Sequence, residues 1–420
     1  MTYQWFKAES RTGVATAVTG LINPWEGSSY TPSTREAGVS YYYAEVTNTD
    51  YWPEGLSPTK GKTNTVQITV TKAADNPDFT PAAAVARLEK YLPRASYDVL
   101  FPNRYGSPYW KGLNPGKDAY DYYNYDELKQ AVREMANFTY YLEVRDDNGV
   151  PSTWNYRATL YNKTTGISKV IFADPEFDAS WNQSKPTHEF RADYGSIFGV
   201  GSENDRKREV AGFLASMVQE TSGGTGIDPP NPSLPNQSGN RFQYALYYNE
   251  EIGYNDNSVG GYTQNPNAAW PPTPGKSYHG RGPKQLSWNY NYGHFSASIY
   301  DGDKFKLLND PAALVRKQGG GLLGWKSAIW FFMTPQTPKP SSHDVMQSTW
   351  RPNAHQAKNG WVWGMGASIM VINGGIEFGF YEGQDFRVDT RIDAYRKIAQ
   401  MLGANITGEK LDTGGMKPLS

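Results

Sequence analysis

The spacing of the apolar residues changes along the chain, and this change limits the folds that the chain can adopt. In residues 1–72, runs rich in β-branched and aromatic residues, such as 41–46 and 65–70, alternate with Gly, Pro, Asn and Asp clusters, a pattern typical of strands. After residue 80 the apolar residues recur at helical spacing, starting from a Thr-Pro pair that can cap and begin a helix. We therefore predict a multidomain protein: an all-β domain over 1–72, a linker over 73–79, and a mostly α-helical α+β domain over 80–420.

The first strand pattern carries a tryptophan that suggests the kind of β domain. The run YQWFK at residues 3–7, with the later pieces 30–32 and 37–39, resembles bacterial immunoglobulin-like modules, in which this segment is the third strand and its tryptophan, here Trp5, is buried between two sheets. We expect such a sandwich, truncated because its first two strands do not precede residue 3. The alternative is a carbohydrate-binding module that exposes Trp5, Trp25 or Trp52 on one flat face.

The predicted helical region is interrupted by strands. A helix is expected over residues 126–135, but from about 138 to 193 alternating runs such as 156–161 and 169–172 predict a β-rich insertion, with Asn148 and Gly149 forming a hairpin turn. A last helix carries apolar residues on one face and ends at Gly403.

The helix before residue 223 is the element most informative about function. Its apolar stripe comprises Val210, Phe213, Leu214 and Met217, and we expect Asp205 to cap it and the glycines at 223 and 224 to end it. Glu220 then lies at the C-terminal end of a buried helix, where the helix dipole favours the protonated carboxyl group. Loops over 225–240 and 253–277, rich in Gly, Pro and Asn, are long enough to wall a cleft.

Composition excludes several classes of function. The net charge is −1 with no basic run, which argues against nucleic acid, and no stretch approaches the roughly 20 apolar residues that cross a bilayer. The chain has no cysteine, no phosphate-binding loop, no nucleophile elbow, and five histidines without metal-ligand spacing. We expect no metal and no organic cofactor. Carboxylate chemistry remains, with Glu220 and the adjacent Glu250 and Glu251 as candidates; glycoside hydrolysis uses two such groups.

Five segments resemble the catalytic domain of glycoside hydrolase family 19 chitinases. They are YHGRGPKQLSWNYNYG at 278–293, AIWFFMT at 328–334, KPSSHDV at 339–345, INGGIE at 372–377 and RVDTRIDAY at 387–395. The resemblance covers roughly residues 80–136 and 203–404, in the order of the family. It implies a lysozyme-like fold and an endo-acting chitinase that cleaves β-1,4 linkages between N-acetylglucosamine units with inversion. The insertion has no counterpart in the resemblance.

The resemblance also implies a role for each matching residue. Glu220 matches the general acid, and Glu251, with Glu250 as the alternative, matches the general base. Ser287 matches the hydroxyl that positions the attacking water. The remaining matches are the sugar-contacting residues Gln285, Asn291 and Asn373 and the charged pair Glu377 and Arg391 behind the acid. We also predict substrate contacts for Trp270, Tyr278 and Ser222; for Trp270, packing of its own loop is an equal alternative.

Two departures from the family pattern leave other functions open. Gln219 stands where the family has His beside the acid, and His279 stands where it has Tyr. The alternatives are a peptidoglycan hydrolase and a catalytically weak chitin-binding protein. For the chitinase we expect chitin or chitooligosaccharides as the partner, a monomer, and secretion from a bacterium. No signal peptide precedes the first strand, so either it was removed or the true start lies upstream. The two missing strands of the immunoglobulin-like module predict a fragment of a longer protein.

Overall fold

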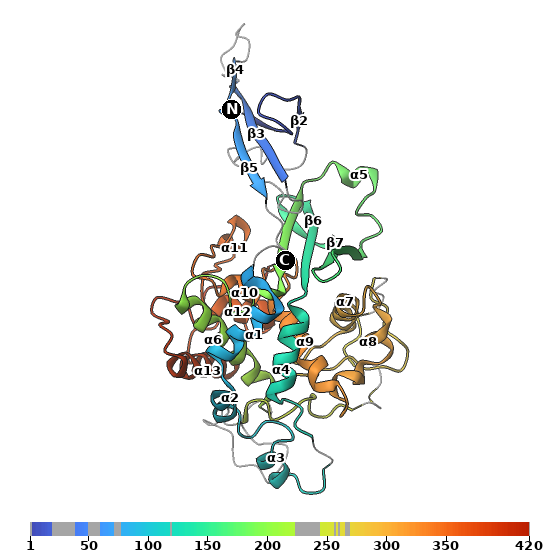
Figure 1. Ribbon diagram of the computed structural model, residues 1–420, viewed down its shortest axis with the longest axis vertical. Helices are drawn as coiled ribbons and strands as arrows, with labels where there is room; N and C mark the ends of the chain where they lie inside the picture. The colour runs from blue at the N-terminus through green and yellow to red at the C-terminus, as the bar shows by residue number, and fades with distance from the viewer. Residues whose placement is uncertain are drawn as a thin grey trace. The chain divides into compact units, whose positions relative to one another are not determined.

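The fold is described from a computed structural model of the 420-residue chain. The structure describes residues 2–18, 38–48, 59–70, 77–117, 120–222, 244–255, 258, 261–264 and 269–419. Predictions for Trp25, Trp52, residues 30–32, the linker over 73–76, the glycines at 223 and 224, and the loop 225–240 lie outside these residues. The chain forms two compact units, Met1–Asn76 with Tyr141–Arg157 and Ala173–Phe190, and Pro77–Tyr140 with Ala158–Phe172 and Arg191–Ser420 (Figure 1).

The N-terminal strands form one antiparallel sheet in the order β2-β1-β3-β4, with β5 also paired to β3. Their bounds are β1 Thr2–Ala8, β2 Ala15–Ala17, β3 Gly38–Asn48, β4 Thr59–Lys62 and β5 Val66–Val70. Phe6 lies opposite Tyr43, and their rings stack with centroids 5.0 Å apart, a cross-strand pair that stabilises the sheet. Trp5 is half-buried. The described part of this region contains a single sheet, so the expected immunoglobulin-like sandwich stays a prediction.

The strands of the insertion form where the alternating pattern predicts them. They are β6 Phe138–Asp147, β7 Val150–Asn162, β8 Ile167–Ala173 and β9 Thr187–Asp193, in the sheet order β8-β7-β6-β9, with the short helix α5 Ser180–Gln183 before β9. Asn148 and Gly149 join β6 to β7 with φ values of 57° and 89°, the left-handed conformation that a two-residue hairpin turn requires. The hairpin prediction is confirmed.

Outside these strands, the second unit is mostly helical. Its α-helices are α1 Pro81–Tyr91, α2 Arg94–Leu100, α3 Pro108–Leu113, α4 Tyr125–Met135, α6 Glu203–Thr221, α7 Asn289–Ile299, α8 Phe305–Asn309, α9 Gly320–Met333, α10 Ser342–Val345, α11 Ala354–Lys358, α12 Met365–Asn373 and α13 Phe386–Leu402. Thr80 caps α1 through its side chain and Pro81 is the first helical residue, as predicted. Short 3₁₀ helices span Pro77–Phe79, Tyr194–Ser196 and Pro311–Val315.

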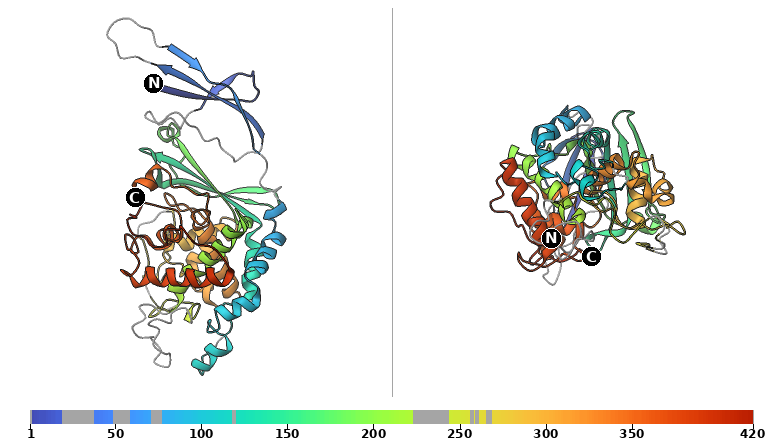
Figure 2. Two further views of the ribbon diagram at one scale, coloured as in Figure 1. Left: turned by 90° about the vertical axis from the view of Figure 1, so that its left-hand side faces the viewer. Right: turned by 90° about the horizontal axis from the view of Figure 1, so that it is seen from below.

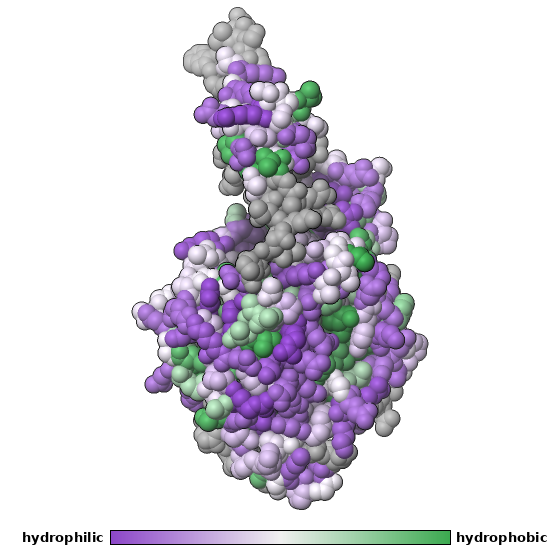
Figure 3. Space-filling view, viewed as in Figure 1, coloured by the Kyte–Doolittle hydropathy of each residue, from purple (hydrophilic) through white to green (hydrophobic). Residues whose placement is uncertain are grey.

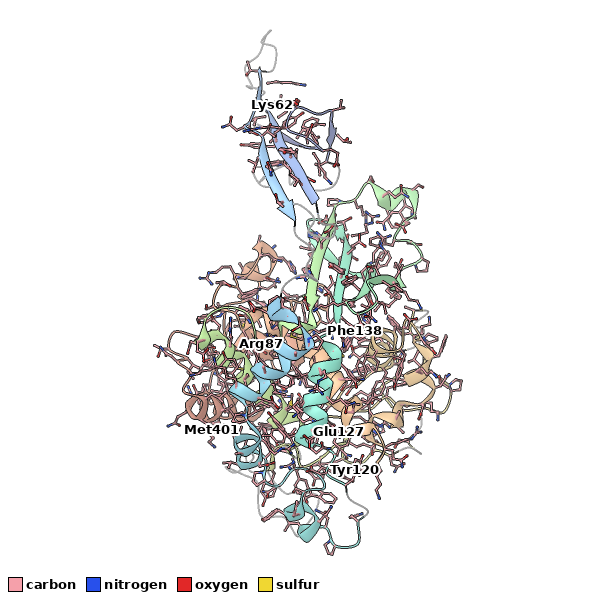
Figure 4. The ribbon with its side chains drawn as sticks, viewed as in Figure 1. Lys62, Arg87, Tyr120, Glu127, Phe138 and Met401 are labelled. Atoms are coloured by element: carbon pink, nitrogen blue, oxygen red, sulfur yellow. The ribbon has the colours of Figure 1, made fainter. Side chains whose placement is uncertain are left out.

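The start of this region is tied to its interior by Arg87 on α1, which is labelled in Figure 4. Its guanidinium donates to the backbone carbonyls of Asp78, Gly195 and Ile197, which lie within or beside the first two 3₁₀ helices. Three carbonyls on one planar cation leave the chain between residues 77 and 81 little freedom to move away from α1.

Helix α6 is the buried centre of the second unit, and it packs along α13 (Figures 1 and 2). All four members of its predicted apolar stripe are buried. The expectation that Asp205 caps the helix was wrong, because Ser202 is the N-cap. The Asp205 carboxylate, three residues on, accepts a hydrogen bond from the Ser202 N–H, and the two residues form a capping box. Helix α13 ends at Gly403, whose φ of 62° closes it as predicted.

The face of the molecule in Figure 3 is largely hydrophilic. Of the helices that the structure describes, none is both long and apolar enough to cross a membrane.

Candidate active site

A cleft of about 730 Å³ lies within the second unit. Its walls come from the end of α6, the segments around 248–252 and 280–291, the segment after α9, and the end of α12. Its lining includes seven predicted site residues: Glu220, Glu250, Glu251, Gln285, Ser287, Asn291 and Asn373. Residues more than 150 positions apart in the sequence therefore meet at one surface.

Glu220 is held at the end of α6 by a buried arginine. The Arg391 guanidinium on α13 donates to the Glu220 carboxylate through Nη2 and to the Ser216 carbonyl through Nη1, at 2.7 Å. Arg391 also pairs with Glu377, with Nε–Oε2 and Nη2–Oε1 distances of 2.8 and 2.9 Å. Burial lowers the pKa of Arg391, but the Glu377 and Glu220 carboxylates raise it by more, so this arginine stays charged.

Asn373 joins the same group of side chains from the end of α12. Its Nδ2 donates to Glu377 Oε1 at 2.7 Å, and its side chain lines the cleft. The structure thus brings Glu220, Arg391, Glu377 and Asn373 together. The bond between Asn373 and Glu377 was not predicted, and the expected sugar contact of Asn373 stays a prediction.

Glu250 is committed to a fixed ion-pair network. One of its oxygens accepts from His279 Nε2 at 2.8 Å and from Arg281 Nε at 2.9 Å, and both partners are fully buried. Burial by itself raises the pKa of Glu250, but the hydrogen bond from His279 and the Arg281 charge lower it overall. Glu250 therefore binds its proton weakly.

Glu251 has neutral partners. Its Oε1 accepts from the Tyr262 hydroxyl at 2.6 Å and its Oε2 from the Gly280 backbone N–H at 3.0 Å. Among the described residues it forms no ion pair. Burial and the Glu251 carboxylate raise the pKa of Tyr262, so the Tyr262 hydroxyl remains a donor. Of the two adjacent glutamates, Glu251 is the one whose charge is not already neutralised by a cation.

Gln285 and Ser287 lie in the turn that leads into α7, and Asn291 lies in the first turn of that helix. The Ser287 hydroxyl donates to the Gln285 carbonyl at 2.8 Å, and Asn291 Nδ2 donates to the Ser287 carbonyl at 2.9 Å. Gln285 adopts a φ of 48°, and its side chain lies so close to Gly280 that a Cβ there would come within 2.7 Å of it. A larger residue at 280 would have to displace the Gln285 side chain.

Three predicted substrate contacts are wrong. Trp270 is only 3% exposed, because its ring stacks on Phe172 and His294 with centroids 4.9 and 5.2 Å away. Tyr278 is fully buried, with its hydroxyl donating to the Leu308 carbonyl. Ser222 is buried at the C-cap of α6. None of the three lines the cleft. All three side chains pack in the interior, which was the alternative given for Trp270.

The cleft also contains residues to which the sequence argument assigned no role. Trp288 is 39% exposed and has a φ of 74°, rare for a bulky residue, which turns its ring edge-on to Tyr262 at 5.3 Å. Lys339 donates to the Val371 carbonyl, and burial lowers the pKa of its ammonium to about 8. Lys284 is buried in the same wall. Trp288 and Lys284 belong to the motif at 278–293, and their place in that motif was the available signal.

The described residues contain no group of three His, Asp or Glu side chains able to hold a metal ion. The cleft contains two carboxyl groups from different segments of the chain. One is paired with a buried arginine and the other is bonded to neutral donors. Acid–base glycoside hydrolases use two such carboxyl groups.

Comparison with known proteins gives the family. Residues 188–413, more than half of the chain, match the profile of glycoside hydrolase family 19, described as chitinase class I. The chain belongs to this family.

Three curated relatives illustrate the range of similar proteins. The chain is 38% identical over 229 residues to chitinase 9 of Oryza sativa subsp. japonica, covering 54% of this chain and 61% of that protein. It is 41% identical to the basic 30 kDa endochitinase of Solanum lycopersicum (53% and 63% covered) and 37% identical to inactive chitinase-like protein 1 of Hevea brasiliensis (53% and 63% covered). The chain thus spans less than two thirds of the length of these relatives.

Among solved structures, chitinase C from Streptomyces griseus HUT6037 aligns with 77% of this chain and 97% of its own, at 21% identity and a TM-score of 0.43.

Proposed function

We propose that this protein is an endo-acting chitinase that hydrolyses β-1,4 linkages between N-acetylglucosamine units by an inverting acid–base mechanism. The observation that carries the proposal is the arrangement of the cleft: Glu220 is held by Arg391, which also pairs with Glu377, and Glu251 and Ser287 line the same cleft. Family membership supports the same reaction.

The two glutamates have opposite tasks in this mechanism. Glu220 donates its proton to the glycosidic oxygen as the bond to the anomeric carbon breaks. Glu251 takes a proton from a water positioned by the Ser287 hydroxyl, and the resulting hydroxide attacks the opposite face of the sugar. Inversion needs room for this water, and we expect the two carboxyl groups to lie about 6.5–9.5 Å apart in the complex.

Glu251 is the better candidate for the base because of its partners. A carboxylate that is shared between His279 and Arg281, as Glu250 is, has a low proton affinity and little freedom to move towards a water. Glu251 accepts only from a hydroxyl and a backbone amide, and it can accept one more proton without breaking an ion pair.

The amide side chains in the cleft suit an N-acetylated sugar. Gln285, Asn291 and Asn373 present donors and acceptors along the lining, and an acetamido group offers one of each. We propose that these three residues orient the sugars beside the cleavage point, with the exposed Trp288 ring available for stacking.

We also propose the finer features of the molecule. The N-terminal strands belong to an immunoglobulin-like module over residues 1–72, the catalytic domain spans 80–420, and the protein is a secreted bacterial monomer. The antiparallel sheet around β3 supports the first of these proposals.

The test is hydrolysis of the N-acetylglucosamine hexamer, with product anomers resolved by NMR in the first minutes. Fresh α-anomer from the β-linked substrate is the expected result, and Glu220→Gln should lose most of the turnover. Fresh β-anomer would overturn the role of Glu251, and near-normal activity of Glu220→Gln would overturn that of the acid. Cleavage of bacterial cell walls in place of the hexamer would indicate a peptidoglycan hydrolase.

One observation favours a second candidate, a chitin-binding protein with weak activity. Gln219 lines the cleft next to Glu220, where the sequence pattern of the family has a histidine. Retention on chitin beads without product release would support this function, and recovery of hydrolysis in Gln219→His would attribute the loss to this one side chain.

A further inference from the structure

Lys284 is a buried cation that the proposed mechanism does not use. It is 5% exposed, its Nζ donates to the Ser216 hydroxyl, and the Phe213 and Phe332 rings lie 5.6 and 5.2 Å from its ammonium. Because a lysine ammonium surrounded by aromatic rings and one hydroxyl has lost most of its hydration, its charge needs a compensating carboxylate.

The contacts of Ser216 connect Lys284 to the acid. Ser216 lies one helical turn before Glu220 on α6; its hydroxyl accepts from Lys284 and its carbonyl accepts from Arg391. Lys284 and Arg391 therefore bond the same residue of α6, one turn before Glu220.

The charges around Lys284 make its protonation sensitive to that of Glu220. Burial, and then the Arg391 charge, lower the pKa of Lys284 to about 7, while the Glu220 charge raises it. The charged groups facing it are Glu220 from α6, Arg391 from α13 and, through Arg391, Glu377; α9 contributes only the Phe332 ring.

Charge balance gives the direction of the coupling. Arg391 stays positively charged, and the Glu377 carboxylate neutralises that charge. When Glu220 is protonated, the net charge of Glu220, Arg391 and Glu377 is therefore zero, and no charge on Lys284 is needed. Once Glu220 has given up its proton, the group carries one excess negative charge, and a protonated Lys284 compensates it. We propose that Lys284 is a positioning residue that stabilises the ionised form of Glu220 and so sets the pH above which the acid no longer holds its proton. This inference rests on the proposed function of Glu220.

The kinetic test compares pH profiles of turnover. In Lys284→Met and Lys284→Gln, which lack the charge, we expect the alkaline limb of the kcat profile to move up by about one pH unit. Ser216→Ala keeps the charge and removes the two hydrogen bonds of the Ser216 hydroxyl, from Lys284 and to the Phe213 carbonyl, so its limb should stay in place. The limb of the control Lys326→Met, whose ammonium pairs with Glu134 outside the cleft, should also stay in place. An unchanged limb in both Lys284 variants would overturn the proposal, whatever their stability.

A second measurement does not need activity. The side-chain ammonium of Lys284, assigned by its absence in Lys284→Met, is titrated by ¹⁵N NMR in the wild-type protein and in Glu220→Gln. We expect the Lys284 titration to shift to lower pH in Glu220→Gln, because the carboxylate that favours its charged form is gone. An identical titration would refute the coupling. If the wild-type protein is inactive at every pH, the proposed function fails while this titration still decides the inference.

Discussion

At the scale of the residue, two adjacent glutamates with the same side chain have different surroundings, and this predicts different effects of the same substitution. Glu251→Gln removes the proposed base and should reduce kcat on the hexamer by about 10²–10⁴-fold. Glu250→Gln should retain most of the turnover but reduce the free energy of unfolding by about 2 kcal/mol, because buried Arg281 loses its ionic partner. Kinetics and urea unfolding of both variants check this. An inactive Glu250→Gln beside an active Glu251→Gln would reverse the assignment.

Single residues also show which features of the site the sequence can and cannot predict. The motifs predicted a charged pair behind Glu220, and Arg391 does bond both Glu220 and Glu377. The catalytic role of Glu220 and the sugar contact of Asn373 stay predictions. Trp270 and Tyr278 were placed in the cleft wrongly, because an aromatic side chain is equally suited to a sugar and to a core. What decided between them was contact with residues distant in sequence, such as Phe172 on β8 and Leu308 on α8.

At the scale of the element, local chemistry predicted most boundaries. The Thr-Pro start of α1, the turn at 148 and 149, and the glycine end of α13 depend on a few adjacent residues, and all occur as expected. The start of α6 differed because Ser202 and Asp205 are both capping residues that hydrogen-bond to each other, and the sequence alone does not say which of them is outside the helix. The order β8-β7-β6-β9 depends on long-range pairing and was not predicted.

Helices α6 and α10 are joined by a buried ion pair whose strength should depend on pH. His343 Nδ1 bonds Glu209 Oε1 at 2.7 Å, and His343 Nε2 lies 3.2 Å from the Ser196 hydroxyl. Burial lowers the pKa of His343, but the Glu209 charge and hydrogen bond raise it overall, above the ordinary value of 6.5.

Because the folded protein binds this proton more tightly than the unfolded chain, the stability that the pair contributes is fully present below about pH 6.5 and is lost as the pH rises through the raised pKa of His343. We expect the free energy of unfolding of the wild-type protein to fall as the pH rises above about 6.5, and to fall less in His343→Gln, which keeps a donor but cannot titrate. Urea unfolding at several pH values measures this. Parallel pH dependences would contradict a charged pair.

At the scale of the whole molecule, the change of apolar spacing predicted a β-rich start and a helical remainder, and the described strands and helices follow it. It did not predict that residues 141–157 and 173–190 belong to the same compact unit as the first 76 residues. Such a grouping depends on contacts between segments far apart in the chain. The expected domain boundaries at 72 and 80 stay predictions.

The second unit contains a histidine that links several of its elements and should limit its stability in acid. His294 on α7 bonds the Tyr140 hydroxyl of β6 at 2.8 Å, stacks on Trp270 and meets the edge of Trp330 on α9 at 5.4 Å. Burial lowers the pKa of His294 to about 4. In the unfolded chain this histidine is protonated near pH 6.5, whereas in the folded protein it is protonated only near pH 4. The contribution of neutral His294 to the free energy of unfolding is therefore fully present above pH 6.5, and about 3 kcal/mol of it is lost as the pH falls towards 4.

Replacing this ring by one that cannot titrate should therefore reverse the order of stability between neutral and acid pH. His294→Phe keeps a ring against Trp270 but deprives the Tyr140 hydroxyl of its His294 partner, which should reduce stability at pH 7 by about 1 kcal/mol. Near pH 4 the variant should be the more stable protein, because it escapes the larger loss that protonation of the unfolded histidine causes in the wild type. Urea unfolding of both proteins at pH 4, 5.5 and 7 would locate the crossing. Curves that remain parallel over this range would show that the His294 ring is protonated in the folded state at the same pH as in the unfolded chain.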